Sequence, residues 1–365
     1  GAHDTPSTEW RRILSAVVDR INNYRSKFEE LGVDAMLVTD DENRRYLSGF
    51  VGTAGYLFIT QDGAVLATDS RYTEQAGNQA PDYRIDRITG RLDWIPGLIG
   101  EFGIKRLGFE SDNVTVQLLD RFKAATAESE NGAADLELIP TSGVPLGLRA
   151  FKDADELALL QRSIDIADHA FTEVSKTIAI GDTEDEIAWR IEVAVREQGA
   201  ESLSFPTIVG SGPNAALPHH RAGDRKVQAG ESIVIDDLPR TVVVGEPDNQ
   251  FKKVYDTVLA AQLTAIESVE AGMTGAEADN LARAVIVEAG YGEEFGHSLG
   301  HGVGLEVHEA PWVASRVETK LEDGMAFTIE PGIYISGWGG VRIEDVVVLE
   351  NGRARVMSHA PKIET

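Results

Sequence analysis

The sequence predicts an α+β protein of two domains, and three observations lead to this prediction. Residues 1–147 alternate helix-like and strand-like segments, as in a small α/β domain with a mixed sheet. A cluster of prolines and glycines at 140–152 then interrupts the pattern, which is typical of a linker. Residues 148–365 contain an internal repeat, which predicts a duplicated α+β unit with pseudo-twofold symmetry.

The composition is that of a folded protein, because 42% of the 365 residues are hydrophobic and 26% are charged. Acidic residues outnumber basic ones by 60 to 34, which gives a formal net charge of -26. Such a surface repels phosphate backbones and anionic lipids, so we expect no nucleic-acid partner and no membrane partner. The chain has no cysteine, which excludes thiolate chemistry and fits a reducing, cytoplasmic setting.

Local signals define the elements of the first domain. Ser7 or Thr8 caps a predicted helix that runs to about Glu30. Asp62-Gly63 is a turn signal that predicts a β-hairpin between the strands on either side of it. The strands expected from short apolar segments are 34–39, 56–60, 64–68, 106–110 and 136–139.

A long helix is expected after the linker. The linker is identified by Pro140, Gly143, Pro145 and Gly147. One apolar stripe with a spacing of three and four residues predicts the helix, and its members are Leu157, Leu160, Ile164, Ala167, Phe171, Val174 and Ile178. Gly181 is expected to end this helix.

The repeat appears in two pairs of matching segments. The patterns Thr183-x-x-Glu and Thr274-x-x-Glu both predict a capping box, and each follows a glycine two residues earlier. Further along, residues 229–236 are similar to residues 323–330, and both segments are apolar strands that end in a carboxylate. Each half is therefore expected to run from a helix through a loop to a buried strand.

Three carboxylates are expected at or near buried strands. Asp236 and Glu330 end the repeated strands, and Glu344 lies within 341–349, a segment with apolar residues on both faces. Arg342 and Glu344 share one face of that predicted strand, so a buried Arg–Glu pair is one interpretation. The pseudo-symmetric Asp236 favours the other, a metal site on the symmetry axis, because a buried carboxylate must be neutralised, paired or metal-bound.

Three of the eight histidines, His297, His301 and His308, lie close together in the sequence. Glycines at alternate positions from 300 to 304 leave room for close backbone approach around His301 and argue against a helix, and the spacing is not that of a zincin. Imidazole and carboxylates together suit Mn, Co, Fe or Zn. Two such ions generate hydroxide near neutral pH and stabilise a peptide oxyanion, so metal-assisted hydrolysis is the predicted chemistry.

These segments resemble the signature blocks of the pita-bread metallopeptidases, in the proline-specific branch that contains aminopeptidase P and prolidase. The blocks are His297–Glu309, Thr328–Tyr334 and Val341–Asp345. In the first domain, Arg45–Phe50 and Thr68–Gln75 are similar to segments of the creatinase-like domain of the same family. The resemblance implies a creatinase-like domain at 1–147 and a catalytic pita-bread domain at 148–365.

The resemblance also implies the site residues. The ligands of two divalent ions would be Asp236, Asp237, His301, Glu330 and Glu344, with Glu344 bridging both ions. Mn²⁺ is the expected metal, with Co²⁺ or Zn²⁺ as alternatives, and a homodimer is the expected assembly. His308 would contact the substrate and help to transfer protons, and His219 would be a second substrate-side histidine that stabilises the intermediate. Arg342 would bind the substrate.

Two further histidines are expected outside the metal site. His297 matches the signature without matching a ligand, so we expect a structural role for it. His220 follows His219 directly, and adjacent residues usually point apart, so only His219 is expected in the site.

The implied reaction is hydrolysis of an Xaa-Pro bond by a metal-bridged hydroxide, either at the N-terminus of a peptide or in a dipeptide. A prolyl bond is a tertiary amide without an N–H, so peptidases that need that N–H reject it. The motifs are shared by aminopeptidases and dipeptidases and do not distinguish them. A creatinase-like hydrolase without metal is disfavoured by the presence of His301, Glu330 and Glu344 together.

One block departs from the family pattern. In the family a hairpin separates the first and second aspartate ligands, whereas here Asp237 follows Asp236 directly and ten intervening residues are absent. Adjacent strand residues point to opposite faces, so these two aspartates do not easily bind one metal pair. Either the chain has a true deletion or the printed sequence omits a loop, and we favour the omission. A true deletion would instead predict a catalytically inactive binding protein on the same fold.

Overall fold

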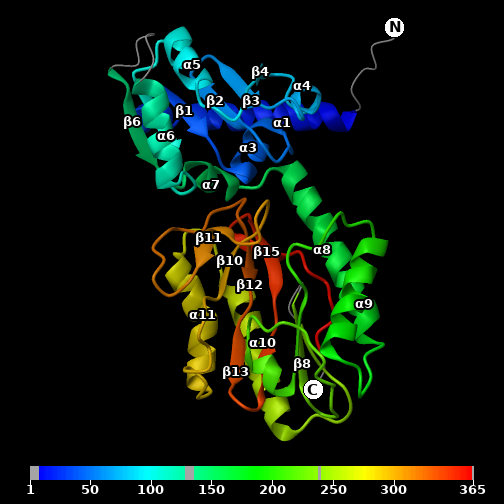
Figure 1. Cartoon of the computed structure of the whole chain (residues 1–365). Coiled ribbons are helices and arrows are strands. Elements are labelled where there is room, and N and C mark those ends of the chain that lie inside the picture. The colour runs from blue at the N-terminus through cyan, green and yellow to red at the C-terminus, as the bar shows by residue number, and fades with distance from the viewer. Residues whose placement is uncertain (1–7, 128–134, 237–239, 364–365) are drawn as a thin grey trace. The chain divides into compact units, whose positions relative to one another are not determined.

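The computed structural model describes residues 8–127, 135–236 and 240–363, and it divides into two compact units, Gly1–Arg149 and Ala150–Thr365 (Figure 1). The elements of the first unit are α1 Thr8–Arg25, α2 Phe28–Leu31, β1 Ala35–Val38, α3 Asp41–Ser48, β2 Tyr56–Thr60, β3 Ala64–Thr68, α4 Thr73–Gln79, β4 Arg84–Arg87, α5 Trp94–Phe102, β5 Arg106–Glu110, α6 Val116–Ala127, β6 Glu137–Thr141 and α7 Val144–Arg149.

The elements of the second unit form two successive halves. The first half contains α8 Ala154–Ser175, α9 Glu184–Glu197, β7 Ile208–Ser211, the 3-10 turn η2 Gly212–Ala216, β8 Ser232–Asp236 and β9 Arg240–Val243. The second half contains α10 Asn249–Ser268, α11 Gly275–Glu288, β10 Gly300–Gly302, β11 Glu309–Val313, β12 Ala326–Ile329, β13 Gly332–Ile335, β14 Gly339–Arg342, β15 Asp345–Glu350 and β16 Arg353–Val356.

The first unit is built on a mixed sheet in the order β4-β3-β2-β1-β5-β6, as the sequence predicts. β1 pairs antiparallel with β2 and parallel with β5, and β2 and β3 form the hairpin expected around Asp62-Gly63. The helix predicted up to Glu30 ends earlier, at Arg25. The N–H of Lys27 bonds the carbonyl of Tyr24 at 3.1 Å, and this tighter turn separates α1 from α2.

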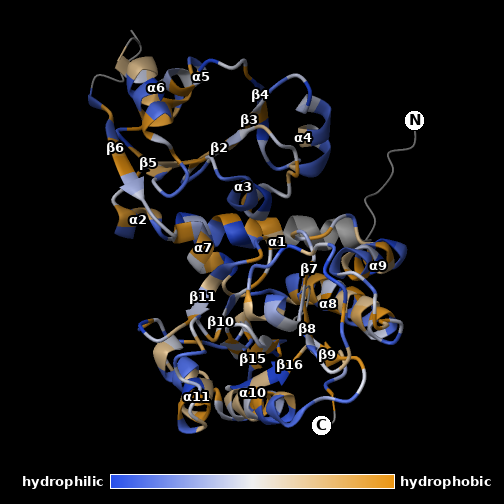
Figure 2. Cartoon of the chain, turned by 60° about the horizontal axis from the view of Figure 1, so that its bottom comes forward, coloured by the Kyte–Doolittle hydropathy of each residue, from blue (hydrophilic) through white to orange (hydrophobic). Residues whose placement is uncertain are grey.

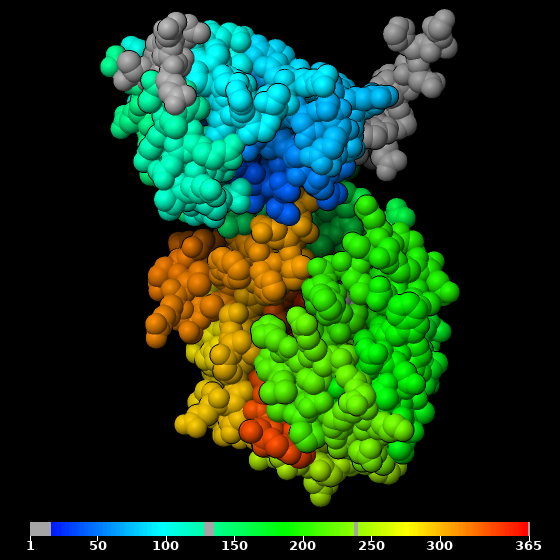
Figure 3. Space-filling model, viewed as in Figure 1, coloured from blue at the N-terminus to red at the C-terminus, as the bar shows by residue number. Residues whose placement is uncertain are grey.

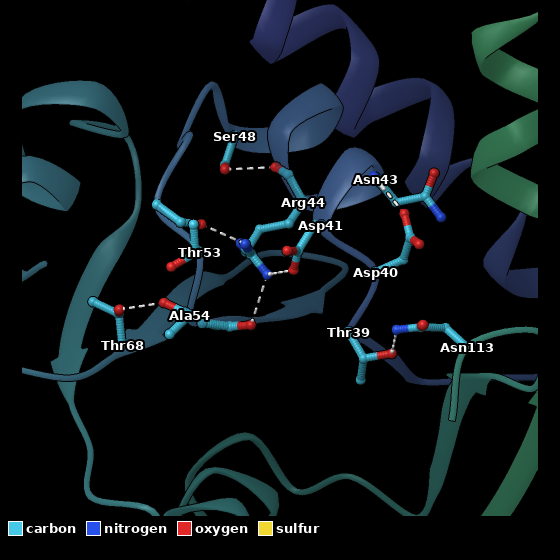
Figure 4. A network of polar contacts seen from close by, with 12 residues as sticks. Thr39, Asp40, Asp41, Asn43, Arg44, Ser48, Thr53, Ala54, Thr68 and Asn113 are labelled. Carbon is cyan, nitrogen blue, oxygen red and sulfur yellow. Dashed lines mark hydrogen bonds and ion pairs between the residues drawn. The ribbon is translucent and has the colours of Figure 1, made fainter. Parts of the chain in front are cut away.

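A buried arginine holds the loop between α3 and β2. The Arg44 guanidinium donates to Asp41 Oδ1 at 2.7 Å and to the Gly55 carbonyl at 3.0 Å (Figure 4). The Thr68 hydroxyl on β3 donates to the Ala54 carbonyl at 2.6 Å. Charge-assisted bonds to backbone carbonyls satisfy both partners away from water, so the loop is fixed against the sheet.

The expected linker at 140–152 is wrong in part, because this stretch is mostly regular structure. β6 extends to Thr141 and α7 occupies Val144–Arg149. Pro145 lies in the first turn of α7, where its missing N–H has no intrahelical partner to lose, so a residue taken as a breaker is compatible with the helix.

The two halves of the second unit share one plan and face each other as green and yellow-to-red bodies in Figure 3. Each half has a helix pair, α8 with α9 and α10 with α11, beside its strands (Figure 1). β7-β8-β9 form the sheet of the first half, and β11-β10-β12-β15-β16 form that of the second. The fold is therefore the duplicated α+β arrangement that the repeat predicts.

The stripe predicted on α8 divides between two cores. Ile164 packs with Ala326 and Val348 of the second half, whereas Phe171 and Val174 pack on α9 and the first half's sheet. The helix ends at Ser175, before the expected stop at Gly181. The N–H and the hydroxyl of Thr177 both bond the Val174 carbonyl, at 2.9 and 2.8 Å, which closes the last turn.

The capping boxes at Thr183 and Thr274 are confirmed. Each threonine hydroxyl accepts from the N–H of the glutamate three residues on, at 3.1 Å, and that glutamate accepts from the threonine N–H. Both α9 and α11 carry apolar and polar segments (Figure 2). Apolar residues such as Ile187 of α9 and Ile286 of α11 are buried in the cores. Among the described residues, no helix is both long and apolar enough to cross a bilayer.

Replacing Thr274 with Ala is expected to lower the free energy of unfolding by about 1 kcal/mol, because α11 loses the acceptor for an N–H in its first turn. Urea denaturation followed by circular dichroism measures this. Thr274→Ser is the matched control, since it keeps the hydroxyl and should unfold close to the wild-type midpoint. Equal midpoints for the two variants would contradict the prediction.

The two halves differ after the repeated strand. β8 pairs antiparallel with β9, and β12 pairs antiparallel with β15. Residues 237–239 alone separate β8 from β9, whereas 330–344 separate β12 from β15 and contain the hairpin β13–β14. This hairpin packs on the other half, since a Cβ added to Gly340 would lie 2.2 Å from the Ala215 carbonyl oxygen in η2. The hairpin brings Arg342 to the end of β8.

Candidate active site

Four residues proposed as metal ligands come from different elements and lie in one buried cluster. Asp236 ends β8, Glu330 follows β12, and His301 is the middle residue of β10. His301 Nε2 lies 3.1 Å from Glu330 Oε1. Glu344 lies between β14 and β15, and its pKa responds to the charges of both Glu330 and Asp236. The structure thus brings both halves of the repeat to one site, as the symmetry argument predicts.

The segment around Glu344 differs from its prediction. The single strand expected over 341–349 is two strands, and residues 343–344 connect β14 to β15. The Arg342–Glu344 pair considered from the sequence is also not the ion pair that forms, because Arg342 Nη2 is paired with the carboxylate of Asp236. A strand spacing of two residues places side chains on one face only while the strand is continuous.

The pKa values of the three carboxylates in the cluster are shifted in different directions. Burial raises the pKa of Glu344 well above its usual range, and the charges of Glu330 and Asp236 raise it further. Burial also raises the pKa of Asp236, although Arg342 opposes this. Burial opposes ionisation of Glu330 as well, but the hydrogen bond with His301 and the charge of Arg342 keep its pKa below the usual value.

Arg342 is held inside the cluster by a second contact. Its Nη1 donates to Tyr334 Oη at 3.2 Å, and that hydroxyl lies 3.1 Å from His297 Nε2. His297 Nδ1 lies 2.8 Å from the Ser298 carbonyl oxygen, and its ring packs edge-on against Phe295. With both ring nitrogens engaged by the protein, His297 has the contacts of a structural residue.

The glycines around His301 allow the close approach predicted from the sequence. A Cβ added to Gly300 would lie 1.9 Å from the Thr328 carbonyl oxygen, and one added to Gly302 would lie 2.0 Å from the Ala310 carbonyl oxygen. No side chain fits at these distances. The backbone of β10 therefore lies directly against its neighbours, and His301 is fixed between them.

The two histidines proposed on the substrate side lie at the edge of the cluster. The ring centroids of His301 and His308 are 4.2 Å apart. Burial lowers the pKa of His308, and the charges of His301 and His219 lower it further. The charge of His219 also lowers the pKa of Asp236, so His219 lies within electrostatic reach of both groups.

His220 contacts a buried glutamate at the start of α9. Its Nε2 lies 2.7 Å from Glu184 Oε2, and Glu184 is fully buried at the start of α9. The other oxygen of Glu184 accepts from the N–H and hydroxyl of Ser211, both at 2.8 Å, and Asn214 donates to the same carboxylate. Glu184 thus ties α9 to the segment that carries His219.

Sequence reasoning missed the role of Glu184 and two buried ion pairs near the site. Lys152 Nζ lies 2.7 Å from Glu309 Oε1, and both side chains are buried. Arg240, also buried, pairs with Asp345 at 2.7 Å. The sequence did offer a signal for the two acidic residues, because Glu309 follows His308 and Asp345 follows Glu344. Their basic partners, Lys152 and Arg240, are too far away in the sequence to be found from local spacing.

The residues of the cluster fit a divalent metal by their chemistry. In the described parts of the chain, no group of three His, Asp or Glu side chains has the arrangement of a metal site, and the carboxylates of Asp236 and Glu330 contact Arg342 and His301 instead. Three buried carboxylates nevertheless share one guanidinium, and their mutual repulsion appears in the raised pKa of Glu344. A divalent cation with oxygen and imidazole ligands offsets such a charge excess. Asp237 lies outside the described residues.

Comparison with known proteins identifies both units as parts of one class of two-domain metallopeptidase. Residues 20–151 match the model of the creatinase/prolidase N-terminal domain, and residues 158–351 match that of metallopeptidase family M24. The chain belongs to metallopeptidase family M24. The resemblance inferred from the sequence, including the creatinase-like domain and the pita-bread domain, is confirmed.

Several relatives match over nearly their whole length. A Pyrococcus horikoshii protein named Xaa-Pro dipeptidase is 38% identical and covers 94% of this chain and 97% of its own. The solved structure of a Xaa-Pro dipeptidase from Bacillus anthracis has a TM-score of 0.90 at 42% identity, covering 95% and 99% of the two chains. That of an X-Pro aminopeptidase from Thermotoga maritima has a TM-score of 0.83 at 37% identity, covering 93% and 99%.

Proposed function

We propose that this metallopeptidase is a dinuclear exopeptidase that hydrolyses Xaa-Pro bonds in dipeptides or at the N-terminus of peptides. The observation that carries the proposal is the buried cluster of Asp236, His301, Glu330 and Glu344. Together with Asp237, these residues are the proposed ligands of two divalent ions. We propose Mn²⁺ as the metal, with Co²⁺ and Zn²⁺ as alternatives. Such ions, when bound, polarise a carbonyl and lower the pKa of water.

The proline preference is supported by the names of the relatives. Proteins similar to this chain over 93% or more of its length are named Xaa-Pro dipeptidase or X-Pro aminopeptidase. Both names occur at similar identity, so they do not favour one substrate length. A prolyl bond lacks the N–H that general peptidases bind, so a site that recognises it must contact other atoms of the substrate.

The side chains proposed to act on the substrate are His219, His308 and Arg342. His219 and His308 lie beside the carboxylate cluster. His308 is the proposed group that contacts the substrate and helps to move protons, and His219 is proposed to contact the substrate and stabilise the intermediate. Arg342 remains charged because Asp236, Glu330 and their neighbours stabilise the cation, so it provides a fixed positive charge for binding.

The expected result is cleavage of Ala-Pro and Ala-Pro-Ala with Mn²⁺ present, and its loss when a chelator is added. Release of alanine measures both rates, and the faster substrate indicates a dipeptidase or an aminopeptidase. Ala-Ala and Ala-Ala-Ala are matched controls, which a proline-specific site should cleave far more slowly. Chelator-insensitive cleavage of Ala-Pro would contradict the proposed metal dependence.

One observation favours a second candidate function, a catalytically inactive binding protein. Only residues 237–239 separate the paired strands β8 and β9, so the first half lacks a counterpart of the hairpin β13–β14 within the described residues. An intact mass above the 39.5 kDa of the sequence would indicate an omitted loop and favour the enzyme. A matching mass, with fewer than two Mn²⁺ bound per chain, would favour the binding protein.

An assembly and a compartment are also proposed. We propose a homodimer, as the family resemblance implies, and a cytoplasmic location, since a chain without cysteine fits a reducing environment. Light scattering coupled to gel filtration measures the first.

A further inference from the structure

Glu344 lies on a short connection that is fastened from the opposite half of the repeat. Residues 342–345 link β14 to β15, and the chain is not in a strand at 343–344. The two residues that fasten this connection, Arg240 and Thr241, are adjacent at the start of β9. Both are buried, with about 1% of their surface exposed. Strand β9 of the first half therefore contacts the connection of the second half that carries Glu344.

Thr241 holds the beginning of the connection. Its Oγ1 donates to the Arg342 carbonyl at 3.0 Å and accepts from the Arg342 N–H at 2.9 Å. One hydroxyl thus satisfies both backbone groups of a residue at the end of β14. A buried pair of hydrogen bonds of this kind leaves two unsatisfied backbone groups when the hydroxyl is removed.

Arg240 holds the end of the same connection. Its Nη1 donates to the Glu344 carbonyl, and its Nη2 donates to Asp345 Oδ1 at 2.7 Å. Asp345 Oδ2 also accepts from Gln262 on α10 at 3.1 Å and from Lys362 at 2.7 Å. Because Asp345 is anchored on two sides, the guanidinium that binds it is also fixed.

The connection at 342–345 carries a carboxylate, Glu344, that lies near two others. Glu330 and Asp236 act electrostatically on Glu344, so its carboxylate is repelled by its neighbours in the cluster. The backbone contacts oppose displacement by this repulsion, because they fix the residues before and after the side chain.

We propose that Arg240 and Thr241 are positioning residues that hold Glu344, and with it Arg342, in place for metal binding and turnover. The inference rests on the proposed metallopeptidase function. Thr241 bonds the backbone of Arg342, and Arg240 bonds the Glu344 carbonyl and the Asp345 carboxylate, so these contacts hold the backbone on either side of the Glu344 side chain. Residues that orient metal ligands without contacting the metal have a comparable role in other metal sites.

The test compares Thr241→Val with Thr241→Ser in the full-length protein. Valine keeps the shape and removes both hydrogen bonds, whereas serine keeps the hydroxyl. Mn²⁺ affinity is measured by competition with a chelating dye, alongside kcat and KM for Ala-Pro. We expect Thr241→Val to bind Mn²⁺ roughly 10- to 100-fold more weakly and to lose kcat with little change in KM, and Thr241→Ser to restore both.

Thr141→Val is the matched control for the loss of a buried hydroxyl. Thr141 donates to the Phe109 carbonyl at 3.0 Å in the first unit, so its removal costs a similar hydrogen bond without touching the connection. It should lose stability but not Mn²⁺ affinity. Arg240→Lys is a second test, since lysine keeps the charge beside Asp345 but cannot also donate in the same fork to Glu344.

The outcomes separate the inference from the function on which it rests. Unchanged Mn²⁺ affinity and kcat in Thr241→Val would overturn the positioning role alone, and so would equal losses in Thr241→Val and Thr141→Val. A wild-type protein that neither binds Mn²⁺ nor cleaves Ala-Pro would overturn the proposed function and the inference together.

Discussion

Replacing Glu344 with Gln is expected to lower the rate of Ala-Pro hydrolysis by roughly 10³-fold or more. The same change is expected to raise the melting temperature of the metal-free protein. Burial and the charges of Glu330 and Asp236 raise the pKa of Glu344, so its ionised form is destabilised in the folded state. This cost applies above the pKa of the unfolded carboxyl, and a neutral amide removes it. Activity assays with Mn²⁺ and thermal melts with chelator, both near pH 7.5, measure the two effects.

The control for Glu344→Gln is Glu350→Gln in the following strand. Glu350 pairs with Arg355 at 2.8 Å on the surface, where an ion pair contributes little. This variant should keep both activity and melting temperature near the wild-type values. If Glu344→Gln retained activity, or if it lowered the melting temperature of the metal-free protein, the cluster would not have the repulsive charge balance described above.

Replacing Gly300 with Ala is expected to destabilise the protein by about 3 kcal/mol and to remove most of its activity. The added Cβ would lie 1.9 Å from the carbonyl oxygen of Thr328 and 2.7 Å from its carbonyl carbon. These are backbone atoms of β12, which cannot rotate away as a side chain does. β10 and β12 must therefore separate, and His301 moves away from Glu330. Chemical denaturation and Mn²⁺-dependent hydrolysis measure the two losses.

The matched control is Gly296→Ala, four residues earlier, in the loop that precedes β10. A Cβ at Gly296 has no atom within 4 Å, and this glycine does not have a positive φ. Its substitution should leave stability and activity close to wild type. Comparable stability of the two variants would mean that β10 and β12 tolerate a wider spacing than their packing implies.

The parts of the fold that the sequence predicts well are those fixed by local chemistry. Thr183 and Thr274 cap helices because hydroxyl and glutamate lie three residues apart, a pattern that needs no distant partner. Asp62-Gly63 specifies its hairpin in the same way. The glycines on either side of His301 likewise predict that the neighbouring backbone lies close to β10. Such features depend on residues within a few positions of one another.

The parts that the sequence does not predict depend on contacts between distant residues. The strand expected over 341–349 is interrupted where Arg240 and Thr241 hold its backbone, about 100 positions away in the chain. Arg342 pairs with Asp236 across the two halves rather than with its neighbour Glu344. Periodicity alone cannot distinguish a continuous buried strand from two strands with a functional connection between them.

Each half of the second unit contributes an element that packs on the other half. α8 of the first half covers β12 and β15 through Ile164, and the hairpin β13–β14 of the second half packs on η2. Either half alone would lose these contacts, and the second half would expose to water the apolar surface of β12 and β15 that Ile164 covers. Two fragments cut between β9 and α10 should therefore fold only when mixed, because each one carries an element that completes the packing of the other.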